Sequence, residues 1–405
     1  MLIRKFPRWA VAVLLSIPAF GAGLAVSAAA SGAPTTTFHA CLHKGALSKV
    51  STSAHTCSTG YRVVSWNAIG PQGIHGPKGT DGTNGIDGSP VACILVTLCA
   101  WGTNFSGGSY AFTVPDEIAF DGAHLWVTNL TGNSVTELNA SDGSWVRTLS
   151  GGSYGFNQPD DIAFDGAHLW VTNTLGNSVT ELNASGGSWV RTLSGGSYGF
   201  SAPIGVAFDG AHLWVTNANG NSVTELNASD GSWVRTLSDG SYGFNQPEGV
   251  AFDGAHLWVT NTSGNSVTEL NASDGSWVRT LSGASYGFNF PFRVAFDGAH
   301  LWVTNTSGNS VTELNASDGS WVRTLSGGSY GFNFPRGVGF DGTHMWVTNE
   351  SSNSVTELNA SDGSWVRTLS GGSYGFSSPW SFAFDGTHLW VTNTSGQSVT
   401  ELWSH

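Results

Sequence analysis

A motif of ten residues recurs seven times along this chain at a constant spacing of 44 residues. It reads Phe-Asp-Gly-(Ala/Thr)-His-(Leu/Met)-Trp-Val-Thr-Asn and begins at Phe120, Phe164, Phe208, Phe252, Phe296, Phe340 and Phe384. A fixed period of this length is typical of solenoids, propellers and other arrays, in which each unit buries its apolar surface against its neighbours. The spacing therefore restricts the fold to a repeat architecture.

Each repeat contains four short runs with the character of β-strands. In the second repeat, residues 162–164 precede an Asp-Gly turn and residues 168–172 follow it, while residues 178–182 and 189–193 form the third and fourth runs. β-branched and aromatic residues bounded by Gly, Asn and Asp favour strands joined by tight turns. Four strands per repeat make one propeller blade, so the sequence predicts an all-β, seven-bladed β-propeller over residues 91–405.

The ends of the repeat array indicate how the ring closes. A second tryptophan occurs once per repeat from Trp145 to Trp365, but the seventh repeat ends at His405 before reaching its own copy. One period before Trp145 lies Trp101, in register with the series. We therefore expect the segment around Trp101 to supply the outer strand of the last blade, which leaves no long sheet edge unpaired.

Three segments precede the predicted propeller. Residues 1–30 have a basic start, a long apolar run and several small residues, which is typical of an export signal, although the run is also long enough to remain as a membrane anchor. Residues 31–69 form a small segment, and residues 70–90 are seven uninterrupted Gly-X-Y triplets. The triplets predict either a collagen-like stalk, which would make the protein a homotrimer, or a flexible Gly-rich spacer.

The number of cysteines and the net charge indicate in which environment the protein acts and which classes of partner it can bind. Four cysteines in an exported chain favour disulfides, and the local pairing of Cys41 with Cys57 and of Cys93 with Cys99 is one of three connectivities. The formal net charge is −13 and basic residues do not cluster, so no nucleic-acid partner is expected. We expect an unidentified extracellular partner, either a protein or a glycan, for a secreted or cell-surface protein.

Comparison of the seven repeats with one another locates the candidate site. Differences concentrate after the proline that opens each inner strand and in the loop between the second and third strands, two places that share one face of a propeller. Loops on a rigid scaffold are common binding sites, although drift in tolerant loops is the alternative explanation. The predicted ligand-binding residues, expected to ring the channel mouth, are Asp116, Glu117, Asp160, Asp161, Glu248, Phe292, Arg293, Arg336 and Trp380. Of these, Phe292, Arg293, Arg336 and Trp380 are expected to be exposed together as anchors.

No catalytic residue and no cofactor is predicted, and a metal is considered only for two blades. Asp116, Glu117, Asp160 and Asp161 could offer oxygen ligands to Ca²⁺, but nothing in the sequence fixes their spacing. The repeated histidines, His124, His168, His212, His256, His300, His344 and His388, each follow a turn and precede a core strand. We interpret them as turn and packing residues rather than as a ring of metal ligands.

The Leu-Trp-Val-Thr-Asn strand after Phe-Asp-Gly resembles the NHL and YVTN-type β-propeller repeats, and more distantly the streptogramin (virginiamycin B) lyases, over residues 101–405. The Gly-X-Y segment resembles the collagen-like repeats of exported bacterial proteins. The lyase resemblance implies a metal-assisted site of His and Glu, but no histidine here lies in a variable loop. The sequence therefore predicts an exported binding or display protein, with a lyase or hydrolase and a surface spacer without a ligand as alternatives.

Overall fold

The computed structural model describes residues 37–43, 46–51, 62–67, 102–238 and 240–403, within two compact units that span residues 1–92 and 93–405. In the first unit, β1 (Thr37–His43), β2 (Ala46–Ser51) and β3 (Arg62–Asn67) form an antiparallel sheet in the order β2-β1-β3. Cys41 belongs to β1, whereas Cys57, Cys93, Cys99, the predicted export signal and the collagen-like segment lie outside the described residues. None of the described residues belongs to a helix that could cross a membrane.

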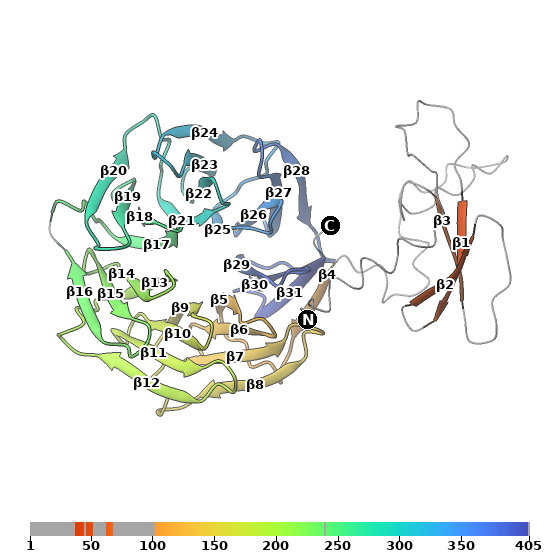
Figure 1. The fold of residues 1–405 in the computed structure, drawn as a ribbon, viewed down its shortest axis with the longest axis horizontal. Coiled ribbons are helices and arrows are strands. Elements are labelled where there is room, and N and C mark those ends of the chain that lie inside the picture. The colour runs from red at the N-terminus through yellow and green to blue at the C-terminus, as the bar shows by residue number, and fades with distance from the viewer. Residues whose placement is uncertain (1–36, 44–45, 52–61, 68–101, 239, 404–405) are drawn as a thin grey trace, which may run out of the picture. The chain divides into compact units, whose positions relative to one another are not determined.

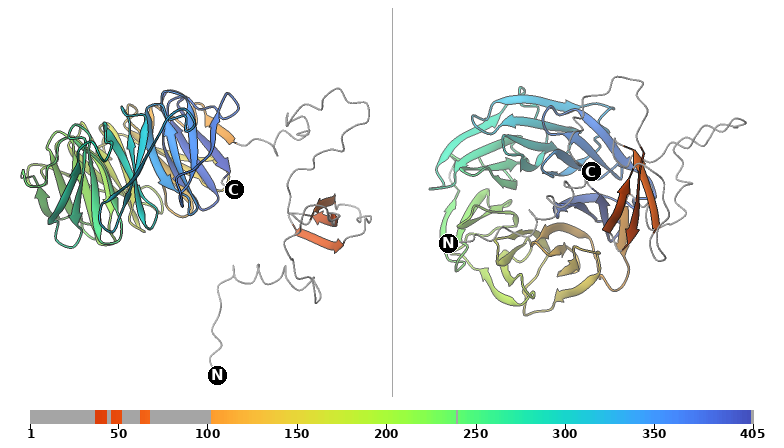
Figure 2. Two further views of the ribbon diagram at one scale, coloured as in Figure 1. Left: turned by 90° about the horizontal axis from the view of Figure 1, so that it is seen from above. Right: turned by 45° about the vertical axis from the view of Figure 1, so that its right-hand side comes forward.

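The second unit is a β-propeller of seven four-stranded antiparallel sheets, as the repeat predicts (Figures 1 and 2). The inner strands are β5 (Pro115–Phe120), β9 (Pro159–Phe164), β13 (Pro203–Phe208), β17 (Pro247–Phe252), β21 (Pro291–Phe296), β25 (Pro335–Phe340) and β29 (Pro379–Phe384). The second strands are β6 (His124–Asn129), β10 (His168–Asn173), β14 (His212–Asn217), β18 (His256–Asn261), β22 (His300–Asn305), β26 (His344–Asn349) and β30 (His388–Asn393).

The third strands are β7 (Ser134–Asn139), β11 (Ser178–Asn183), β15 (Ser222–Asn227), β19 (Ser266–Asn271), β23 (Ser310–Asn315), β27 (Ser354–Asn359) and β31 (Ser398–Trp403). The outer strands are β8 (Trp145–Ser150), β12 (Trp189–Ser194), β16 (Trp233–Leu237), β20 (Trp277–Ser282), β24 (Trp321–Ser326), β28 (Trp365–Ser370) and β4 (Gly102–Ser106). Blades 1 to 6 each run through four consecutive strands, whereas blade 7 consists of β29, β30, β31 and β4.

The closure of the ring is confirmed. β4 pairs antiparallel with β31, from Ser106 opposite Ser398 to Gly102 opposite Leu402. Trp101 itself lies just before the described residues. Because β4 comes from the start of the propeller and β31 from its end, backbone hydrogen bonds hold the two ends together and cover the edge that β31 would otherwise expose.

The core lies between the blades and explains why the motif repeats. The tryptophan of each second strand is fully buried and packs against the next blade: Trp126 of blade 1, for example, contacts Leu169 and Val171 of blade 2. Trp390 of blade 7 packs against Leu125 and Val127 of blade 1, so the same contact closes the circle. Each sheet is therefore stabilised by its neighbours, as apolar burial in a closed repeat array requires.

A buried threonine in each second strand joins neighbouring blades at the channel. The Thr128 hydroxyl accepts a hydrogen bond from the backbone N–H of Glu117 (3.0 Å) and donates one to the backbone carbonyl of Asp160 in blade 2 (2.7 Å). The equivalent bond from Thr392 to the carbonyl of Asp116 joins blade 7 to blade 1 (2.6 Å). Because these bonds use backbone atoms, they hold the inner strands in place whichever side chains those strands carry.

The face of the propeller opposite the variable residues is nearly the same in all seven blades, and we call it the uniform face. It carries the Asp-Gly turns and their histidines. Asp121 accepts hydrogen bonds from the backbone N–H of His124 (2.7 Å) and from the indole of Trp126 (2.7 Å). The His124 ring lies between the carboxylates of Asp121 (3.5 Å) and Glu137 (3.7 Å), and Glu137 is paired with Arg147 (2.8 Å). This arrangement confirms that the histidines belong to the turns and to blade packing.

Candidate functional site

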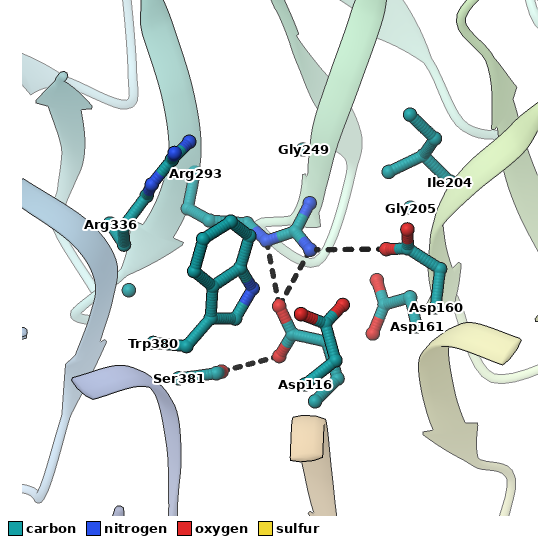
Figure 3. A network of polar contacts seen from close by, with 12 residues as sticks. Asp116, Asp160, Asp161, Ile204, Gly205, Gly249, Arg293, Arg336, Trp380 and Ser381 are labelled. Atoms are coloured by element: carbon teal, nitrogen blue, oxygen red, sulfur yellow. Dashed lines mark hydrogen bonds and ion pairs between the residues drawn. The ribbon is translucent and has the colours of Figure 1, made fainter. Parts of the chain in front are cut away.

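The variable residues that follow each proline lie within the inner strands and gather at the central channel (Figure 3). They occupy the second and third positions of β5, β9, β13, β17, β21, β25 and β29. The expectation of exposed anchors is wrong for Phe292, which is 7 % exposed, and for Arg293 and Arg336, whose side chains are 12 % and 13 % exposed. Asp116 and Glu117 are buried as well. These side chains are buried because seven inner strands converge on a narrow axis, where each side chain is covered by those of the other blades.

The third residue of the inner strand is charged in some blades and small in others, and the close packing of neighbouring inner strands gives a steric reason for the small residues. Charged residues stand there in blades 1, 2 and 5, and small residues in the other four: Glu117, Asp161, Gly205, Gly249, Arg293, Gly337 and Ser381. A Cβ atom on Gly205 would lie 2.3 Å from the carbonyl oxygen of Glu248, and one on Gly249 would lie 2.7 Å from that of Phe292. The small residues therefore leave the axis free for three long or charged side chains.

An ion-pair network crosses the channel between blades that are not adjacent. The Arg293 guanidinium of blade 5 donates to the Glu117 carboxylate of blade 1 through Nη2 (2.6 Å) and Nε (3.0 Å). The same Nη2 lies 3.7 Å from the Asp160 carboxylate of blade 2. The Ser381 hydroxyl of blade 7 donates to the other Glu117 oxygen. A two-point contact to a carboxylate orients the guanidinium, so four blades are linked around one cation (Figure 3).

Carboxyl groups outnumber the guanidinium that they surround. Burial raises the pKa of Asp160 to about 6 and that of Asp161 to about 7, in each case opposed by the charge of Arg293. Burial, followed by repulsion from Asp160 and Glu117, raises the pKa of Asp116 well above its ordinary value. Burial also raises the pKa of Glu248 to about 7. The cluster therefore holds protons near neutral pH unless another cation balances the carboxylates.

Phe292, Arg336 and Trp380 form a second group in which a guanidinium lies among aromatic rings. The Arg336 guanidinium carbon lies 4.2 Å from the Trp380 ring centre, 4.6 Å from that of Phe292 and 4.6 Å from that of Phe334. Its Nε donates to Glu350 in the loop between β26 and β27 (2.7 Å). These residues therefore satisfy one another through cation–π contacts and an ion pair, instead of standing free as separate anchors.

Two buried donors at the channel have no hydrogen-bonding partner among the described residues. They are the Nη1 of Arg293 and the indole Nε1 of Trp380. Asp116, in the same cluster, is only 3 % exposed and lies in the electrostatic field of Arg293 and of the neighbouring acids. Buried donors are normally paired, so these two are available to an acceptor from outside the described residues.

The carboxylates that were considered for Ca²⁺ are mostly engaged. Glu117 is bound by Arg293 and Ser381, and Asp161 accepts backbone N–H groups from Ile162 (2.7 Å) and Val206 (3.0 Å). No group of three or more histidine, cysteine or acidic residues in the described part of the chain has the arrangement of a metal site. A Ca²⁺ ion would have to displace Arg293 from these oxygens, so the donor set fits this metal poorly.

Ser381 and Glu350 were missing from the predicted site. Ser381 follows Trp380 at one of the variable positions, and Glu350 lies in a variable loop between the second and third strands. Both were visible as departures from the repeat. Their partners were not, because Glu117 and Ser381 are separated by 264 residues and meet only when the ring closes.

Sequence comparison gives no relative: no family model and no curated protein matches the chain. Solved structures with the same fold include a streptogramin B lyase, with 17 % identity, a TM-score of 0.59 and coverage of 75 % of this chain and 98 % of the other. A catalytically inactive histidine-to-alanine variant of virginiamycin B lyase from Staphylococcus aureus, determined with quinupristin, matches with 18 % identity, a TM-score of 0.60 and coverage of 75 % and 99 %.

Hydrazine synthase from Kuenenia stuttgartiensis matches with 19 % identity, a TM-score of 0.60 and coverage of 73 % of this chain and 96 % of the other. At these identities the likeness establishes the propeller fold alone. The neighbours include proteins with unrelated names, as expected for an architecture that carries many functions.

Proposed function

We propose that this protein is an exported binding protein whose channel cluster takes a small polar ligand carrying an ammonium group and a hydrogen-bond acceptor. The observation that carries the proposal is a pair of buried donors without an acceptor, Nη1 of Arg293 and Nε1 of Trp380, in the same cluster as the buried carboxyl group of Asp116. An ammonium group would donate to this carboxylate and offset the repulsion among the acids around it. The unpaired Nη1 of Arg293 and Nε1 of Trp380 would donate to the acceptor of the ligand.

The groups in the cluster define the class of ligand. A buried carboxyl group, Asp116, lies in the same cluster as two donors that lack an acceptor, Nη1 of Arg293 and Nε1 of Trp380. A free amino acid or a comparably small zwitterion carries both the cation and the acceptor that these groups require. The inner strands begin at the face that carries the variable loops, and the ligand would enter the channel from that face.

Binding is tested by thermal shift and calorimetry on the full chain with the twenty amino acids, choline, spermidine and CaCl₂ as probes. We expect at least one amino acid to stabilise the protein. The Asp116→Asn variant should lower its affinity about tenfold or more, because the buried charged partner of the ammonium is lost. Affinity should rise with pH, because the raised pKa of Asp116 keeps its carboxyl group protonated to a higher pH than that of an ordinary aspartate.

The matched control is Asp142→Asn, which changes a carboxylate in an exposed turn of the uniform face. This variant should bind the probe as the unaltered chain does. If CaCl₂ were the only probe that stabilised the protein, the ligand would be a metal ion and not a zwitterion. The absence of any shift or heat with all probes would contradict the binding function and favour a structural spacer.

A lyase is the second candidate, because two of the structural neighbours are streptogramin-type lyases. One of these is named as inactive after replacement of a histidine, whereas the repeated histidines of this chain lie between turn aspartates and buried glutamates. Incubation of the protein with quinupristin and divalent cations, followed by mass spectrometry, tests this activity. A linearised product that disappears with a chelator would establish it.

Export and assembly are part of the proposal and rest on the sequence before the propeller. The basic and apolar residues 1–30 support secretion or anchoring at the cell surface, and the triplets of residues 70–90 support a trimeric stalk. Mass spectrometry of the mature N-terminus distinguishes cleavage from anchoring. Light scattering of the full chain distinguishes a trimer on a collagen-like stalk from a monomer on a flexible spacer.

A further inference from the structure

Exposed tryptophans recur around the rim of the propeller, and the channel site does not use them. Six of them begin the outer strands, and the seventh ends β31; their exposed fractions range from 43 % to 54 %: Trp145, Trp189, Trp233, Trp277, Trp321, Trp365 and Trp403. The six outer strands that carry them follow one another around the periphery (Figure 1). Exposure of so many large apolar side chains at equivalent positions is uncommon in a soluble protein and marks an interaction surface.

The six indoles of the outer strands are held in a fixed orientation. The Nε1 of Trp145 donates to the hydroxyl of Thr148 three residues later (3.0 Å), and the same bond occurs at Trp189, Trp233, Trp277, Trp321 and Trp365. Because the only polar group of the indole is already satisfied, what each tryptophan offers to a partner is the face and edge of its ring. A fixed aromatic face is a platform for stacking.

Two hollows with polar side chains in their lining lie on the face that carries the Asp-Gly turns. A hollow of about 460 Å³ between blades 7 and 1 is lined by His388, Asn139 and Ser141, among others. Its counterpart between blades 4 and 5, of about 400 Å³, is lined by the equivalent residues His256, Asn315 and Ser317.

The hollow and the platform are neighbours along one turn. Asn139 lines the hollow, Trp145 follows it six residues later, and the backbone N–H of Asn139 donates to the carbonyl of Ser144 to close the turn between them (2.9 Å). Asn315 and Trp321 are related in the same way in blade 5. The two hollows and their tryptophans therefore form the same structural unit in two blades.

We propose that the rim of the propeller is a multivalent binding surface for a neutral polysaccharide, with one tryptophan platform and its adjoining polar turn in each of blades 1 to 6. Pyranose rings expose apolar C–H faces that stack on an aromatic ring, and their hydroxyl groups bond to amides, hydroxyls and carboxylates at its side. A polymer of repeated sugar units matches a surface of repeated sites. Binding at several weak sites of one polymer gives high avidity without any single strong contact.

Two other partners fit these observations less well. A protein interface has a contiguous apolar core, whereas these tryptophans are separated from one another by whole blades and surrounded by polar residues. A polyanion needs free basic groups, but the neighbouring Arg147 is bound to Glu137 (2.8 Å) and the arginines of the other outer strands are paired alike. The formal charge of −13 also opposes an anionic polymer.

Affinity electrophoresis of the full chain in native gels tests this proposal with galactomannan, arabinoxylan, mixed-linkage glucan and dextran as neutral probes and alginate as the anionic probe. We expect at least one neutral polysaccharide to retard the protein. The triple variant Trp277→Ala, Trp321→Ala, Trp365→Ala should weaken that apparent affinity about tenfold or more, because avidity falls steeply with each lost site.

Two controls separate recognition from a structural role. Phenylalanine at the same three positions keeps an aromatic face and should retain most of the retardation, whereas a merely structural role would lower the melting temperature of the alanine variant without changing retardation. The Asp116→Asn variant should be retarded normally, because the channel lies apart from the rim. Retardation by alginate alone, by no neutral polysaccharide, or equally with the alanine variant would overturn the proposal.

Discussion

The channel and the rim of this propeller both use glutamate–arginine pairs, but in opposite settings. Glu117 and Arg293 pair across the channel from blades 1 and 5, with side chains only 10 % and 12 % exposed. Glu137 and Arg147 pair across adjacent strands of one blade, with a glutamate that is only 2 % exposed but an arginine that is 43 % exposed. On the rim, the same glutamate–arginine pair recurs from blade to blade, and its arginine remains in contact with water. In the channel, the pair is buried because the closed ring of blades surrounds it.

Removal of residues 93–106 is the most severe way to break this comparison, because it deletes the outer strand of blade 7 and so opens the rim. We expect loss of soluble protein or a fall of more than about 10 °C in melting temperature, since β31 would be left as an exposed edge. Truncation of residues 1–92 is the matched control and should leave the propeller transition in place. Equal melting temperatures for both truncations would show that β4 does not close the ring.

Glu117→Gln and Glu137→Gln compare the two pairs directly. The first substitution leaves Arg293 buried without its main counter-charge and should lower the free energy of unfolding by about 3–5 kcal/mol. The second leaves a partly hydrated Arg147 and should lower it by about 1 kcal/mol. Urea denaturation measures both values. Similar losses at the two sites would mean that the channel is as hydrated as the rim.

The pH dependence of stability should come mainly from the channel. A carboxyl group whose pKa is raised by folding stabilises the protein fully below its ordinary pKa, and this contribution is lost as pH rises through the raised value. With Asp160 at about 6 and Asp161 and Glu248 at about 7, the free energy of unfolding should fall between pH 5 and pH 8.

The Asp116→Asn variant tests how much of this predicted pH dependence comes from Asp116. It removes a buried carboxyl group of raised pKa, so it should raise the free energy of unfolding more at pH 8 than at pH 5. Thermal denaturation at both pH values measures the effect. A variant whose pH profile follows that of the unaltered chain would show that Asp116 does not titrate in this range.

The smallest expected effect concerns the threonine bonds between blades. Thr216→Val removes the hydroxyl that donates to the backbone carbonyl of Glu248 (2.7 Å) and should lower the free energy of unfolding by about 1 kcal/mol. Thr236→Val removes a comparable hydroxyl from the half-buried outer strand and should cost about half as much. Equal values in chemical denaturation would remove the distinction between inner and outer threonines.

The repeat was sufficient to predict the blades because its signals are local and repeated. The buried tryptophan, the Asp-Gly turn and the four strand-like runs recur once in every 44 residues. A strand that is hard to recognise in one repeat can therefore be assigned from the other six. The register of Trp101 with the later tryptophans also predicted the closing strand, now seen as β4 against β31. The predicted cluster of acidic, basic and aromatic residues from different blades is likewise found at the channel.

What the sequence determined by itself is therefore the number of blades, their four-strand composition, the closure and the face on which variation is gathered. Only the tertiary structure decided that Phe292 and Asp116 are buried, that Arg293 meets Glu117 across 176 residues of chain, and that two donors at the channel lack an acceptor among the described residues. The reason is physical. Local strand and turn preferences act within one repeat, whereas pairing and burial at the axis depend on the reach of side chains from seven blades at once and on the space that glycines elsewhere in the ring leave open.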